Sequence, residues 1–134
     1  MEIKTSTESG RVPVTVVHVD GDIDSATYLI FEKKVDELID GGARYILADF
    51  SHVPYVSSAG LRALHSIHNK LRALHPDVSL SDEDMKKGVS AGTYKSPHLK
   101  LLNLSSNTRK AFELSGFDMY IETFSDMKTA IASF

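Results

Sequence analysis

The chain has 134 residues, of which 42% are hydrophobic and 25% are charged, as expected for one soluble globular domain. It contains no cysteine, which excludes disulfides and thiolate chemistry and is typical of a cytoplasmic protein. The net charge of −3 argues against direct nucleic-acid binding, and the sequence offers neither an apolar run long enough to span a membrane nor a secretory signal at its start.

The first part of the chain predicts two strands and a helix. A β-branched run at 12–19 predicts a strand, and a short strand at 3–5 precedes it across the turn-forming Ser9-Gly10. Asp24 then stands where a helix N-cap is expected, and Gly41-Gly42 would end that helix. Between them, apolar residues recur at helical spacing: Ala26, Ile30, Val35, Leu38 and Ile39.

A near-continuous apolar run at 45–50 predicts a strand that is buried on both faces. A helix is expected to open near Ser57-Ser58 and to end at Pro76. Its buried stripe would consist of Leu61, Leu64, Ile67 or His68, Leu71 and Leu74. Polar residues and glycines dominate the next stretch, at about 75–97, which predicts an inserted, exposed loop.

The last part predicts a strand at 99–104, a helix capped by Ser105-Ser106 and closed by Gly116, and a short strand at 119–121. Ser125 would cap a final helix with one apolar face, formed by Met127, Ala130, Ile131 and Phe134. The alternation of strands and helices predicts a single α/β domain over residues 1–134, with a mostly parallel sheet of four to five strands and about four helices.

In such a sheet, sites gather beyond the carboxyl ends of the strands. Three loops should meet there, at 20–24, 51–58 and 103–106, whereas the long loop should lie at the opposite pole. Acidic residues are concentrated at 20–40, and none occurs from Ser51 to His75. This asymmetry indicates either two oppositely charged solvated helix faces or a segment that tolerates an anion.

The second of these loops places two hydroxyls, Ser57 and Ser58, at the start of a helix. Unpaired backbone N–H groups and the helix dipole would stabilise a phosphate attached there. Arg62 follows one turn later and could pair with the added charge. Gly60 lacks a Cβ, so the backbone could approach an attached phosphate or a partner chain closely. The plain alternative is an ordinary serine N-cap.

Three motifs in order resemble the STAS domain family, which includes bacterial anti-sigma factor antagonists and cytoplasmic domains of sulfate transporters. The first is similar to the family signature and consists of Asp49, Val53, Val56, Ser57, Ser58, Ala59, Gly60 and Leu61. Gly21-Asp22-Ile23-Asp24 and the segment from Asn103 to Phe117 resemble the flanking motifs. Two features depart from the family pattern: Ser57 stands where the best-known members have Asp, and the 75–97 loop is longer.

The resemblance implies a STAS-like fold and a non-enzymatic anti-sigma factor antagonist without a cofactor. It implies phosphorylation of Ser58, with Ser57 as second choice, and contacts with partners through Asp22, Asp24, Ser57, Gly60, Leu61 and Arg62. The unphosphorylated form would bind an anti-sigma factor, often itself a serine kinase, and so release the sigma factor. Phosphorylation would break that complex and a serine phosphatase would restore it. The alternative is a non-phosphorylated STAS subunit that acts as a scaffold or accessory in a transport or signalling complex.

Two further arrangements rank lower. His65 and His68 lie at i and i+3 and could share a metal, but a zinc site usually needs three or four ligands. Ser58, His52 and Asp24 could form a hydrolytic triad, but Ser58 does not lie in a nucleophile elbow. The sequence therefore predicts neither a metal site nor an enzyme.

Overall fold

The computed structural model describes residues 1–74 and 95–134. The predicted loop at about 75–97 thus lies almost wholly outside the described residues, as does Pro76. The elements are β1 (Glu2–Ser9), β2 (Pro13–Asp20), α1 (Tyr28–Asp40), β3 (Ile46–His52), α2 (Ser58–Leu74), β4 (Leu99–Leu102), α4 (Ser106–Ser115), the 3-10 turn η1 (Phe117–Met119), β5 (Glu122–Phe124) and α5 (Met127–Ala132).

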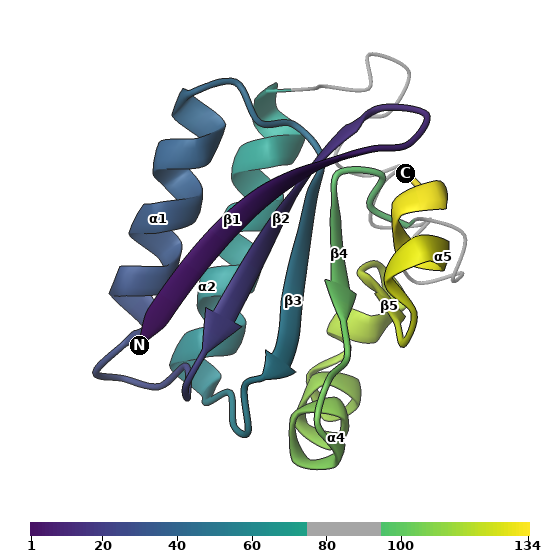
Figure 1. Ribbon diagram of the computed structural model, residues 1–134. Coiled ribbons are helices and arrows are strands. Elements are labelled where there is room, and N and C mark those ends of the chain that lie inside the picture. The colour runs from purple at the N-terminus through teal and green to yellow at the C-terminus, as the bar shows by residue number, and fades with distance from the viewer. Residues whose placement is uncertain (75–94) are drawn as a thin grey trace.

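The strands form one five-stranded sheet in the order β1-β2-β3-β4-β5. β1 runs antiparallel to β2, and the remaining neighbours are parallel. Helices α1, α2 and α4 cover one face of the sheet, and α5 packs on the other (Figure 1). The predicted α/β fold with a mostly parallel sheet is confirmed.

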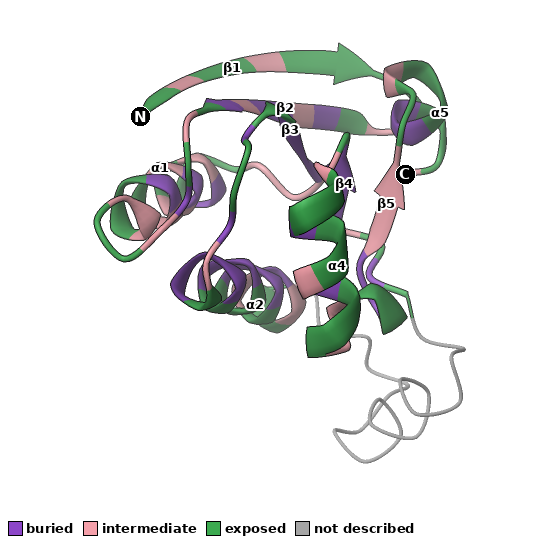
Figure 2. Ribbon diagram, turned by 90° about the horizontal axis from the view of Figure 1, so that it is seen from below, coloured by how far each residue is buried: buried purple, intermediate pink, exposed green. Residues whose placement is uncertain are grey.

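The two faces of the sheet bury different side chains. On the α1 and α2 side, β2 contributes Val17 and Val19, and β3 contributes Ala48 and Phe50. On the α5 side, a smaller cluster joins the sheet to α5: Val14, Val16, Leu47, Leu102, Ala130 and Ile131. Residues 46–50 are all buried, which confirms the prediction of a strand covered on both faces. Figure 2 shows that β1, at the edge of the sheet, is far more exposed than the inner strands.

Helix α1 begins later than the sequence predicts. The Asp24 carboxylate accepts hydrogen bonds from the backbone N–H groups of Ala26 and Thr27, so Asp24 closes a turn before the helix rather than capping it. Thr27 is the residue that precedes Tyr28 at the helix start. Ala26 is therefore outside the helix and exposed, which contradicts its predicted place on the buried face.

The buried face of α1 consists of Phe31, Val35 and Ile39. The predicted Ile30 is 52% exposed, because Phe31, one position later, occupies the core side at that turn. In α2 the predicted stripe is confirmed except at its last residue, since Leu74 is 46% exposed at the end of the helix. The glycine stop of α1 is confirmed, because Gly41 is its C-cap.

The last strand also lies later than predicted. Tyr120 and Ile121 are buried, but their N–H groups donate to the Phe117 carbonyl in a tight turn rather than to a neighbouring strand. Their buried apolar side chains give the sequence pattern of a strand, although the backbone forms a turn there. The strand itself is Glu122–Phe124. Asp126, not Ser125, caps α5, since its carboxylate accepts a hydrogen bond from the Thr129 N–H.

Candidate functional site

Backbone hydrogen bonds hold the β2–α1 and β3–α2 loops side by side at the carboxyl pole of the sheet. The N–H of Gly21 donates to the His52 carbonyl at 3.0 Å, and the N–H of Ile23 donates to the Tyr55 carbonyl at 3.0 Å. The Ser57 N–H donates back to the Ile23 carbonyl at 2.8 Å, and Ile23 forms a parallel bridge with Val56. These bonds fix the start of α2 against the β2–α1 loop.

The third loop joins the same pole through side chains. The Asn103 amide donates to the Ser51 hydroxyl at 2.8 Å, and the Ser105 hydroxyl donates to the Pro54 carbonyl at 3.0 Å. Ser105 also caps α4 by accepting from the Thr108 N–H, as the sequence predicts. The three predicted loops therefore meet, at the lower end of the sheet in Figure 1.

At the start of α2 the two serines have different roles. The Ser57 hydroxyl accepts from the Gly60 N–H at 3.3 Å, and the Ser57 carbonyl accepts the first helical bond, from the Leu61 N–H at 2.9 Å. Ser57 is therefore the N-cap and Ser58 is the first helical residue. Ser58 is exposed, and within residues 1–74 and 95–134 its hydroxyl makes no hydrogen bond.

Gly60 is buried and serves the interior of the molecule. A Cβ at this position would lie 2.6 Å from Val56 Cγ1 and 2.9 Å from both Cγ2 and the carbonyl oxygen of Ile23. The glycine lets the first turn of α2 press against the β2–α1 loop. This contact gives a packing reason for glycine here, in addition to the predicted approach of a phosphate or a partner.

The other predicted contact residues are divided between surface and interior. Leu61 is buried at 7% exposure, whereas Arg62 is exposed and follows Ser58 by four residues. Asp22 is exposed, and its carbonyl accepts from the Thr27 hydroxyl. The Asp24 carboxylate is half-buried and stabilises its own loop. Ser58, Arg62 and Asp22 thus form the accessible part of the predicted set.

A hydrogen-bond network that sequence reasoning missed lies behind this pole, on the α5 side of the sheet. The Ser6 hydroxyl and His18 Nε2 are 3.1 Å apart, and His18 Nδ1 lies 2.8 Å from Asp49 Oδ2. The Ser51 hydroxyl and N–H both donate to Asp49 Oδ1. Burial alone would raise the pKa of Asp49, but the hydrogen bonds from Ser51 and His18 hold it below its ordinary value.

The sequence contains a signal for this network, because side chains alternate between the two faces of a strand. His18 continues the face that Val14 and Val16 begin on β2, and Asp49 follows Leu47 on β3. Which histidine and which carboxylate meet depends on the strand register, where His18 lies opposite Asp49. The sequence does not give that register.

The lower-ranked arrangements are not assembled. No hydrogen bond in the described ranges links Ser58, His52 and Asp24, and the Asp24 carboxylate is engaged in its own turn. His65 Nδ1 lies 2.8 Å from the Tyr120 hydroxyl, and the His65 ring stacks on Phe117. In the described part of the chain no three His, Cys, Asp or Glu residues are grouped to hold a metal.

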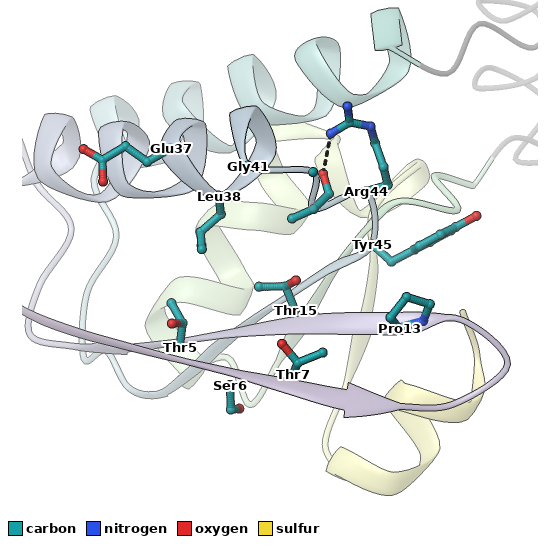
Figure 3. Close-up of a pocket in the computed structure, with 12 residues that line it drawn as sticks. Thr5, Ser6, Thr7, Pro13, Thr15, Glu37, Leu38, Gly41, Arg44 and Tyr45 are labelled. Atoms are coloured by element: carbon teal, nitrogen blue, oxygen red, sulfur yellow. Dashed lines mark hydrogen bonds between the residues drawn. The ribbon is translucent and has the colours of Figure 1, made fainter.

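His68 is buried beside this aromatic cluster, and burial lowers its pKa to about 4. It is therefore neutral at physiological pH. A separate groove lies under the β1–β2 hairpin, where Thr5, Thr15 and Leu38 face one another and Arg44 donates to the Ala43 carbonyl at 2.8 Å (Figure 3). None of its lining residues belongs to the start of α2.

No described helix is long and apolar enough to cross a bilayer.

Comparison with known proteins places this geometry in a family. The STAS domain model matches residues 5–82. A protein of Bordetella bronchiseptica provisionally named anti-sigma factor antagonist BtrV is 25% identical over 114 residues, which cover 85% of this chain and 80% of that protein.

Two solved structures share the fold. An anti-sigma factor antagonist from Mycobacterium paratuberculosis has a TM-score of 0.68 at 20% identity, over 98% of this chain and 93% of that one. The Bacillus cell fate determinant SpoIIAA in its phosphorylated form has a TM-score of 0.63 at 17% identity, over 97% of this chain and 96% of that one.

Proposed function

This chain belongs to the STAS domain family, and we propose that it acts as an anti-sigma factor antagonist whose binding is switched by phosphorylation of Ser58. It would work as a binding module rather than an enzyme. The observation that carries the proposal is the exposed Ser58 hydroxyl at the first position of α2, which makes no hydrogen bond within the described residues. The names of the Bordetella and Mycobacterium proteins support the antagonist role, and the Bacillus structure, a phosphorylated form, supports control by phosphorylation.

The proposed partners are an anti-sigma factor that is itself a serine kinase and a serine phosphatase. The unphosphorylated chain would bind the anti-sigma factor and free the sigma factor. The kinase would then modify Ser58 and end the complex, and the phosphatase would restore the binding form. The partner surface would include Asp22 and Arg62 around Ser58, with Asp24, Ser57, Gly60 and Leu61 holding that surface in shape.

Ser58 is favoured over Ser57 because the two hydroxyls are differently engaged. Phosphorylation of Ser57 would replace the acceptor that caps α2 and would have to fit beside the Ile23 and Val56 backbone. Ser58 projects from the first turn, where a kinase can reach it without breaking a hydrogen bond of the described residues. Modification at Ser58 therefore costs the fold less.

The switch would act through local charge. A phosphate adds about 1.5–2 negative charges at neutral pH. The first turn of α2 contains no acidic residue, its N–H groups favour an anion, and Arg62 lies one turn away. The fold should therefore absorb the phosphate. A partner packed on Ser58 would have to desolvate a dianion at a pole that also carries the exposed Asp22, which should end binding.

Exposed apolar residues border the same pole and fit a partner-binding role. Leu29 and Ile30 in the first turn of α1 are 60% and 52% exposed, and Tyr55 in the β3–α2 loop is 50% exposed. The hydrogen bond from the Ile23 N–H to the Tyr55 carbonyl joins the two segments. Replacing Leu29 and Ile30 by Ser should weaken partner binding. Leu114, which is 85% exposed on α4, provides the matched control, since L114S should leave binding unchanged.

The test of the proposal is incubation or co-expression of the chain with a cognate anti-sigma factor kinase and ATP, followed by mapping of the modified residue. Modification at Ser58, lost in S58A and retained in S57A, is expected. Modification at neither serine would refute the switch. If S58A also left partner binding and its regulation unchanged, the alternative of a STAS scaffold subunit would account better for the chain.

A further inference from the structure

Among the described residues, β1 forms the outer margin of the sheet, and its outer edge pairs with no other strand. It pairs with β2 alone among the described strands, and Figure 2 shows it at the rim of the molecule. Six of its eight residues are exposed and the other two are half-buried. An open edge of this length presents a row of backbone N–H and C=O groups that another strand can pair with. The opposite edge strand, β5, has three residues.

We infer that β1 is a self-association surface, through which two copies of this chain join edge to edge into one continuous antiparallel sheet. A two-fold axis perpendicular to the sheet would relate the copies. Such an axis places side chains of the same sheet face directly opposite one another. Glu2, Lys4, Ser6 and Glu8 share one face of β1, so these residues would meet one another across the junction.

Among the registers that pair most of β1 with its copy, the charges select one. With Ser6 on the axis, Lys4 of each copy lies opposite Glu8 of the other, which gives two opposite-charge pairs. Shifting the register by two residues places Glu2 opposite Glu8, and a further shift in that direction places Lys4 opposite Lys4. The reverse shift leaves Lys4 opposite the uncharged Gly10. Like charges directly opposite are destabilising and opposite charges are favourable, so the first register is preferred.

The other face of β1 fits the same register. Thr5 of each copy lies opposite Thr7 of the other, and threonine pairs are favourable across antiparallel strands. Figure 3 shows Thr5 and Thr7 on the α1 side of the strand and Ser6 on the other. Both threonines are exposed, because they line a groove that α1 does not fill. Apart from the half-buried Ile3, β1 presents only polar side chains to a second strand.

The arrangement is independent of the function proposed for Ser58. Glu2 pairs with Asp20, so the amino end of β1 lies at the pole where α2 begins. The two-fold axis reverses β1 in the second copy and would send the two α2 starts to opposite ends of the joined sheet. Both would stay free to bind. Lys4 already makes an exposed ion pair with Glu2 at 3.6 Å, which is weak enough to be shared.

One strand edge buries less area than a stable interface, so the association should be reversible. Sedimentation equilibrium of the full chain should show the weight-average mass rising towards that of a dimer between ~20 µM and ~1 mM, and less so in ~1 M NaCl. K4E and E8K should each stay monomeric, because each places like charges across the junction. An equimolar mixture of K4E and E8K should associate, since every pair then becomes opposite in charge.

K33E and E113K make the same charge changes on exposed positions of α1 and α4 and should associate like the parent. Because the chain has no cysteine, a second readout uses S6C. Opposed residues on the axis lie about 4.5–5.5 Å apart, within disulfide range. Mild oxidation should cross-link S6C and leave N107C, on exposed α4, monomeric.

A parent chain that stays monomeric throughout this range would overturn the inference. So would a mixture of K4E and E8K that associates no more than either variant alone. Melting temperatures of all variants should match the parent, because Lys4 and Glu8 are exposed. Cross-linking of N107C as fast as S6C would show random collision and would contradict the proposed register.

Discussion

Gly60 offers the sharpest test of how the start of α2 is held. In G60A the new methyl would lie 2.6 Å from Val56 Cγ1 and 2.9 Å from both Cγ2 and the carbonyl oxygen of Ile23. A side-chain tip could rotate away, but the Ile23 carbonyl cannot, because it accepts the Ser57 N–H at 2.8 Å. The helix must shift or that hydrogen bond must lengthen.

The two opposing effects can be compared. Overpacking of this kind costs about 1–3 kcal/mol, and replacing Gly by Ala inside a helix gains at most about 1 kcal/mol. We expect G60A to lower the free energy of unfolding by about 1–2 kcal/mol. For a chain of this length that lowers the melting temperature by about 3–8 °C.

Urea denaturation of G60A, V56A and V56A/G60A measures the effect. The double variant should lose less free energy of unfolding than the two single variants lose together, because removing the Val56 methyls relieves the closest contact. A G60A variant as stable as the parent would show that the loop and the helix are not packed together as described. It would also remove the explanation for glycine at this position.

Further predictions concern the capping serine and two buried ionisable groups. S57A should lose about 1 kcal/mol of stability as an N-cap, while S58A should change it by less than about 0.5 kcal/mol; equal losses would contradict the cap assignment. Because burial holds the pKa of His68 at about 4, below its unfolded value, the unfolded state binds the proton more tightly. Stability should therefore fall as pH drops from 6.5 to 4, by on the order of 3 kcal/mol, and H68Q should flatten that slope. Asp49 has its effect at lower pH. Because its pKa is lower in the folded state, it contributes stability above its unfolded pKa, and this stability is lost as pH falls through its folded pKa. D49N should abolish this loss.

Hydrophobic patterning in the sequence was sufficient to predict the fold. The apolar run at 45–50 predicts a doubly covered strand, which the structure has from Ile46, and strand–helix alternation predicts the parallel sheet and the pole at which three loops meet. Helix faces were harder. Ile30 and Phe31 are adjacent, and the choice between them depends on where α1 begins, which the turn at Asp24 decides.

The site could be predicted as a location but not in its internal roles. Either of two adjacent serines at a helix start can be the cap. The hydrogen bonds from the Gly60 and Leu61 N–H groups to Ser57 distinguish the cap from the first helical residue, Ser58. The packing role of Gly60 could not be predicted for the same kind of cause, since it depends on a contact with Ile23, a residue distant in sequence. The His18–Asp49 pair likewise depends on the register between two strands.

The most direct test of the account is the affinity of the anti-sigma factor for three variants, measured beside their melting temperatures. S58D should bind markedly more weakly than the parent while melting within about 2 °C of it, since an exposed surface change alters stability little. S58A should bind like the parent and no longer respond to the kinase. An S58D variant that binds like the parent, or that loses affinity only together with its fold, would contradict a switch that works by local charge at the start of α2.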